Sequence, residues 1–142
     1  MAAVGYTAHV RILLICAVFS AAALAAADAS ERVTVRGTIT AVEDEPIVLT
    51  TDSGSALELI VEEADTFHTF HDPELADRTW ELEGFHRGDN QFEVRALFTI
   101  KDGERFKVTY YCEICHITSY RPGMCMCCQE DVELREVPVT ED

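Results

Sequence analysis

The sequence predicts a mainly β protein in which a small sheet domain is followed by a cysteine-rich module. Short segments of alternating apolar and polar residues recur between residues 31 and 111, separated by turn residues, as expected for half-buried strands. Five of the six cysteines lie between residues 110 and 133. The chain of 142 residues can bury one modest core, so we expect a single domain and its attached module.

Residues 1–27 predict a signal peptide. They contain a basic start that ends at Arg11, an uncharged apolar run over residues 12–24, and an A-x-A cleavage site at residues 25–27. The run is shorter than the roughly 20 apolar residues that cross a bilayer. We therefore expect cleavage, loss of Cys16 with the leader, and a periplasmic or extracellular protein without a stable membrane span. An uncleaved N-terminal helix that anchors the protein is the alternative.

The charge of the chain is strongly negative. Asp and Glu number 26 against 11 Lys and Arg, a formal net charge of -15. Binding to a nucleic-acid backbone requires Lys and Arg that replace condensed counterions, and anionic membrane surfaces attract the same residues. We expect no nucleic-acid partner, and we interpret the acidity as a means of keeping an exported protein soluble.

Residues 28–106 are predicted to form a small β-domain of five strands. A polar, acidic stretch over residues 62–77 interrupts the alternation after the third strand. Pro73 can open a short helical turn there, with Asp72 as its cap. The predicted strands cover residues 31–41, 47–51, 56–61, 79–85 and 92–100.

Three strands, a short helical connection and two further strands resemble the element order of the OB-fold, a small five-stranded Greek-key barrel. This resemblance rests on the order of elements, and an open meander or sandwich is the alternative. The large aromatic residues at strand positions are expected in the core: Trp80, Phe85, Phe92, Phe98 and Phe106.

The cysteine cluster predicts a metal site. Cys112 and Cys115 form one Cys-x2-Cys pair, Cys125 and Cys128 form a second, and nine residues separate the pairs. A Cys-x2-Cys turn, or knuckle, brings two thiolates to one side, and two facing knuckles supply the four sulfur ligands that zinc prefers. We therefore predict that these four cysteines bind Zn²⁺.

Residues 107–142 form this module, which is expected to continue directly from the β-domain. Its order of strand, knuckle, strand, knuckle and strand resembles a zinc ribbon, which implies a structural zinc ion. The knuckles lie closer together than is usual in zinc ribbons, and Cys127 falls inside the second one. Cys127 and His116 are therefore candidate substitute or additional ligands.

Two further resemblances concern exported proteins. Pro122 and Gly123 precede a cysteine pair, which is similar to short heavy-metal-binding segments of exported metal-handling proteins. The pattern of a leader, an OB-like β-domain and a C-terminal zinc-ribbon-like CxxC and CxCC module resembles uncharacterised exported bacterial proteins. That resemblance implies no activity.

Other chemistries of the cluster remain open. Residues 124–128 are an unbroken run of Met and Cys, and thiolate with thioether ligands suits Cu⁺. An oxidising compartment permits disulfides, which would favour a thiol–disulfide oxidoreductase. An iron–sulfur site uses the same ligands but is disfavoured, because the chain is exported before a cluster could be loaded.

The remaining motifs are weak. His68 and His71 lie among carboxylates and could bind a second metal ion, but we favour a solvated acidic loop. No catalytic arrangement of side chains can be identified from the sequence. We expect a non-catalytic, metal-stabilised binding or assembly module whose partners are a metal ion and another protein of the cell envelope.

Overall fold

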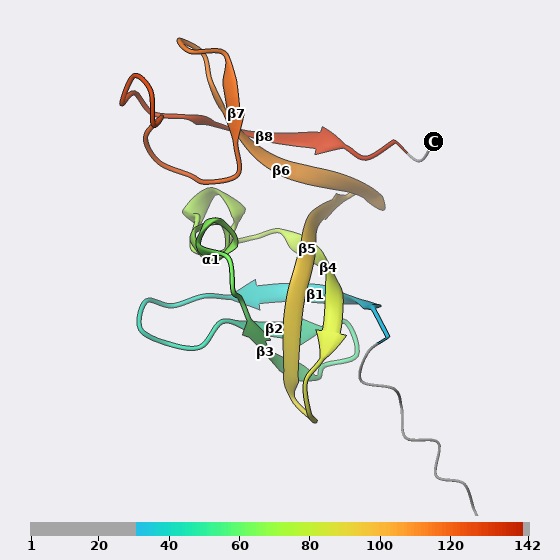
Figure 1. Cartoon of the computed structure of the whole chain (residues 1–142). Helices are drawn as coiled ribbons and strands as arrows, with labels where there is room; N and C mark the ends of the chain where they lie inside the picture. Colours follow the sequence, from blue (N-terminus) through green and yellow to red (C-terminus); the bar gives the residue numbers. More distant parts are fainter. Residues whose placement is uncertain (1–30, 141–142) are drawn as a thin grey trace, which may run out of the picture.

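The structure is a computed structural model that describes residues 31–140 and contains eight strands, one α-helix and one 3₁₀ helix. The predicted signal peptide lies outside the described residues. Figure 1 shows two groups of strands, β1 to β5 and β6 to β8, with helix α1 between them on the side away from the β5–β6 connection. No helix in the described part of the chain has the length and hydrophobicity needed to span a membrane.

The strands agree closely with the segments predicted from the alternation. The strands of the first group are β1 (Val33–Thr40), β2 (Val48–Thr51), β3 (Ala56–Ile60), β4 (Thr79–His86) and β5 (Gln91–Lys101). The strands of the second group are β6 (Glu104–Cys112), β7 (Ile117–Ser119) and β8 (Glu133–Pro138).

The pairing of β1 to β5 is cyclic. Strand β1 pairs with β2 and β4, β2 pairs with β3, and β4 pairs with β5, all antiparallel. Strand β3 also pairs with β5, in parallel. The pairing therefore runs from β1 through β2, β3, β5 and β4 and back to β1. Glycine is needed at the irregularity of the β4–β5 ladder, because a Cβ on Gly84 would overlap the Glu93 carbonyl group.

The core takes side chains from these strands, from the helical segment between β3 and β4, and from β6. Trp80 and Phe92 are buried there, as predicted, together with Leu49 and Leu82. The prediction was wrong for the other three aromatic residues, which are only half-buried. Each has a basic side chain over its ring, an arrangement that suits an aromatic residue on the outer face of a sheet; these pairs are Phe85 with Arg87, Phe98 with Arg105 and Phe106 with Lys101.

The acidic stretch contains more helix than the sequence predicted, because it forms both α1 (Ala64–Phe70) and the 3₁₀ helix η1 (Pro73–Leu75). Phe70 anchors α1 to the core: its buried ring packs edge-on against Trp80, with 5.2 Å between the ring centroids. The predicted cap is confirmed, since the Asp72 carboxylate accepts a hydrogen bond of 3.0 Å from the Glu74 amide.

Strand β6 links the β-domain to the cysteine module. It begins in a hairpin with β5 whose turn residues, Asp102 and Gly103, have φ angles of 51° and 82°, typical of a two-residue turn that matches strand twist. It ends at Cys112, and β8 pairs along most of its length. Strand β6 therefore runs across the predicted boundary between residues 106 and 107.

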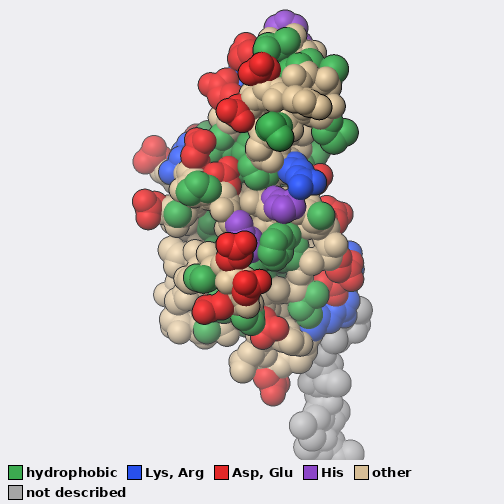
Figure 2. Space-filling model, turned by 90° about the vertical axis from the view of Figure 1, so that its left-hand side faces the viewer, with side chains coloured by type: hydrophobic (Ala, Val, Ile, Leu, Met, Phe, Trp, Pro, Cys, Tyr) green, Lys and Arg blue, Asp and Glu red, His purple; other side chains and the backbone are tan. Residues whose placement is uncertain are grey.

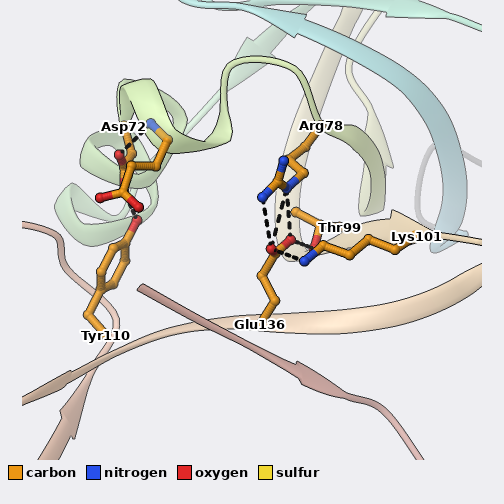
Figure 3. A network of polar contacts seen from close by, with 7 residues as sticks. Asp72, Arg78, Thr99, Lys101, Tyr110 and Glu136 are labelled. Atoms are coloured by element: carbon orange, nitrogen blue, oxygen red, sulfur yellow. Dashed lines mark hydrogen bonds and ion pairs between the residues drawn. The ribbon is translucent and has the colours of Figure 1, made fainter. Parts of the chain in front are cut away.

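Two buried polar clusters hold the parts together (Figure 3). The Tyr110 hydroxyl donates a 2.6 Å hydrogen bond to Asp72, and burial together with this bond raises the pKa of Tyr110. The carboxylate of Glu136, on β8, accepts hydrogen bonds from Arg78 at 3.1 Å and from Thr99 at 2.6 Å, and it forms an ion pair with Lys101. Each cluster joins residues far apart in the sequence.

The pKa of Glu136 falls below its ordinary value. Burial opposes the charged form, but hydrogen bonds from Arg78, Lys101 and Thr99 favour it and outweigh burial. The ionised carboxylate therefore stabilises the folded state at neutral pH. This contribution is lost as pH falls below 4.5 toward the lower pKa of the folded protein.

We predict that Glu136→Gln lowers the free energy of unfolding by about 1.5 kcal/mol at neutral pH, because charge-assisted hydrogen bonds become neutral ones. Urea unfolding of both proteins across pH 3 to 8 measures the difference, which should shrink below pH 4.5. Glu133→Gln, at an exposed carboxylate of the same strand, is the control and should change stability little. Equal effects of the two substitutions at all pH values would contradict this account.

Candidate metal centre

The first knuckle is the turn between β6 and β7. Cys112 pairs with Ile117 at the end of the ladder, and the chain turns through the residues between them. The His116 amide donates a 2.8 Å hydrogen bond to the Cys112 carbonyl, and His116 has a left-handed backbone with φ of 54°. The amide of Cys115 also points at the Cys112 sulfur, at 3.4 Å. This turn places both sulfurs on one side.

The second knuckle repeats this geometry. The Gln129 amide donates a 3.0 Å hydrogen bond to the Cys125 carbonyl, and Gln129 has φ of 63°. Gln129 follows Cys128 as His116 follows Cys115, so both knuckles use the residue after the second cysteine to complete the turn. This role of Gln129 was not predicted from the sequence. The available signal was that Gln129 directly follows Cys128, as His116 directly follows Cys115.

The two knuckles bring together the four cysteines predicted as ligands. The sulfurs of Cys112, Cys115, Cys125 and Cys128 all lie within 4.8 Å of one another. Cys112 and Cys125 are buried, and Cys115 and Cys128 are partly buried. Such a group of sulfurs could hold a metal ion. The structure thus places the four residues together, and their role as ligands remains a prediction.

The candidate substitute ligands lie outside this group. Cys127 is exposed and is not one of these four sulfurs, although its thiol is within hydrogen-bonding reach of the Cys115 thiol. The Nδ1 atom of His116 is 2.9 Å from the Tyr111 hydroxyl. Among residues 31–140, the four cysteines are the only group of His, Cys, Asp and Glu side chains that could hold a metal ion. His68 and His71 are not part of such a group, and His71 Nδ1 lies 2.9 Å from the Phe67 carbonyl oxygen.

The thiols differ in acidity because they share one small volume. Hydrogen bonds from the amides of Cys128 and Cys127 lower the pKa of Cys125 to about 7. The pKa of Cys115 is raised, chiefly by hydrogen bonds to the thiols of Cys127 and Cys128. A hydrogen bond from the Glu130 amide favours the Cys128 thiolate, but burial and a hydrogen bond with Cys112 together outweigh it, so the pKa of Cys128 is raised. Four adjacent sulfurs therefore favour a mixture of thiols and thiolates unless a cation compensates their charge.

No protein-family model, curated protein or solved structure matches this chain.

We predict that Gln129→Gly stabilises the protein by about 0.5 to 1 kcal/mol, because glycine adopts a positive φ without steric strain. Thermal unfolding of the variant measures the gain as a higher Tm. The control is Glu130→Gly, at the next exposed position, which should lower stability because it only adds freedom to the unfolded chain. A loss of stability in Gln129→Gly would show that the second knuckle does not have this geometry.

Proposed function

We propose that this protein is an exported, zinc-stabilised β-domain that acts as a non-catalytic binding or assembly module. The observation that carries the proposal is the convergence of four cysteine sulfurs from two knuckles of the same geometry. Zn²⁺ prefers four tetrahedral sulfur or nitrogen ligands in structural sites, whereas catalytic zinc sites keep one position open. A complete set of four protein ligands therefore favours a structural ion.

The need for an ion is clearest in the segment that carries the second knuckle. Residues 120–132 join β7 to β8 with a single isolated bridge, Met124 to Asp131. Cys125 is the only buried residue of this segment, and Met124 and Met126 are exposed. Little apolar burial is available to order such a segment, and metal coordination supplies that free energy in small modules.

We propose further that β1 to β5 form an OB-like barrel. The cyclic pairing through β1, β2, β3, β5 and β4 and the position of α1 between β3 and β4 support this architecture. The leader-like pattern of residues 1–27 supports export to the periplasm or the extracellular space.

The metal content of the protein tests the proposal. We predict one zinc ion per chain, resistant to a chelator such as EDTA until the protein unfolds. Cys112→Ser should lose the ion, because only three cysteine ligands remain. It should also lower the Tm by more than about 10 °C, because the metal no longer orders the two knuckles. Elemental analysis and thermal unfolding measure both effects.

Cys127→Ser is the matched control, because it removes a thiol of the same knuckle that lies outside the group of four. It should keep the ion and the Tm. A metal-free native protein whose mass is lower by the hydrogens of two disulfides would contradict the zinc proposal and favour a thiol–disulfide oxidoreductase.

A second candidate function is the handling of copper or another soft metal. It is favoured by three soft side chains at the surface of the second knuckle: Met124 is 70% exposed, Met126 is 96% exposed, and Cys127 is also exposed. A metal carrier should exchange its ion with a chelator while folded. Chelator exchange therefore distinguishes this function from a structural zinc site.

A further inference from the structure

Strands β5 and β6 separate soon after their hairpin. Their ladder stops at the pair Thr99 and Phe106, although both strands continue well beyond it. Figure 1 shows the two strands diverging, with α1 beside the opening between them. A cavity of about 290 Å³ lies in this opening, between residues 95–98 of β5, residues 107 and 108 of β6, and α1. We call it the β5–β6 gap.

The hydrogen-bonding direction of β6 is fixed at both ends of the gap. The Arg105 carbonyl accepts a 2.9 Å bond from the Val139 amide, toward the β8 side. The Cys112 carbonyl accepts its bond from the opposite, β7 side. Because backbone groups alternate between the two sides of a strand, those of Val108 point toward the gap. No residue in the described range pairs with Val108 on this side.

Strand β5 offers a matching position. Lys101 and Glu104 flank the two-residue turn and form the first hydrogen-bonded pair of the hairpin. The same alternation directs the backbone groups of Thr99, and then those of Leu97, toward β6. Leu97 lies beyond the last paired residue, so its N–H and C=O groups also face the gap. Leu97 and Val108 are thus two unpaired edges of one cavity.

Leaving the backbone groups of Val108 without hydrogen bonds costs free energy. Val108 is only 4% exposed, and a buried backbone group without a hydrogen bond costs about 1 to 3 kcal/mol. A strand added between Leu97 and Val108 would provide donors and acceptors to both edges. Hydrogen-bonding complementarity therefore specifies an extended backbone as the occupant.

The charges on the walls restrict this occupant further. Lys107, at the β6 wall, lies 5.4 Å above the Tyr120 ring and forms no ion pair with any residue between 31 and 140. Glu63 and Asp65 lie on the α1 wall. Figure 2, which views this side of the molecule, shows more acidic than basic side chains on its surface. A cation without a partner is therefore unusual here and would attract an acidic side chain.

We propose that the β5–β6 gap binds an extended segment of a partner protein, which adds as a strand to the unpaired edges at Leu97 and Val108. An acidic side chain of the segment pairs with Lys107. The inference rests on the proposed role as a binding module and names its surface and the class of its ligand. It does not depend on the identity of the metal.

Peptide selection tests the proposal directly. The protein, purified with its metal, is used to select from a library of displayed ten-residue peptides. Thr66→Trp fills the gap from α1, since Thr66 lines the cavity, and should abolish binding of the selected peptides. Ala64→Trp is the matched control, because Ala64 is exposed on the same helix outside the cavity, and it should bind them normally.

Hydrogen exchange locates the binding. A bound peptide should slow exchange of the Leu97 and Val108 amides by at least about tenfold. It should leave Thr109 unchanged, because the backbone of Thr109 points toward β8. Lys107→Glu should weaken binding by about tenfold, and Arg121→Glu, at an exposed cation outside the cavity, should not.

The proposal is overturned if no peptide is selected, if Thr66→Trp and the unaltered protein bind equally, or if a second copy of this chain gives the protection. If a bound peptide slows exchange in the two knuckles and not at Leu97 and Val108, the β5–β6 gap is not the binding site, but the role as a binding module stands. Metal analysis of the same samples is independent of these outcomes. Slowed exchange at Leu97 and Val108 in a native protein that contains no metal would support peptide binding at the β5–β6 gap and refute the zinc proposal.

Discussion

Four sulfur atoms within 4.8 Å of one another cannot all be ionised unless a cation lies among them. Two thiolates about 4 Å apart repel each other by about 4 kcal/mol at an effective dielectric constant of 20. The protein nevertheless directs amides at these sulfurs, and the amides of Cys128 and Cys127 lower the pKa of Cys125 to about 7. A divalent cation among the four sulfurs would resolve this conflict, and we propose that the fold of the cysteine module depends on it.

The consequences reach the β-domain through two strands. Cys112 ends β6, which begins in the hairpin with β5, and β8 follows the second knuckle and pairs along β6. Strand β8 carries Glu136 to Arg78, Thr99 and Lys101 of the β-domain. Ordering the knuckles therefore also positions a buried carboxylate, so the metal centre and the sheet domain are expected to stabilise each other.

Much of the fold could be predicted from local pattern. Alternation identified the strands because each one has a buried face, and the Cys-x2-Cys spacing identified the four converging cysteines because the turn is short and local. The helix content of the acidic stretch was underestimated, since the contact of Phe70 with Trp80 that anchors α1 joins residues from different elements. The pairs of Asp72 with Tyr110 and of Arg78 with Glu136 have no local pattern. The unpaired edge at Leu97 could not be predicted either, because it depends on where two strands diverge in space.

The zinc K-edge X-ray absorption spectrum of the protein, purified from its own compartment without reductant, tests the central claim most directly. The account predicts four sulfur neighbours at about 2.3 Å and no lighter ligand. A nitrogen or oxygen neighbour in the first coordination shell would show that His116 or water replaces a cysteine and that the closed site is wrong. A protein without a metal edge would contradict the account as a whole.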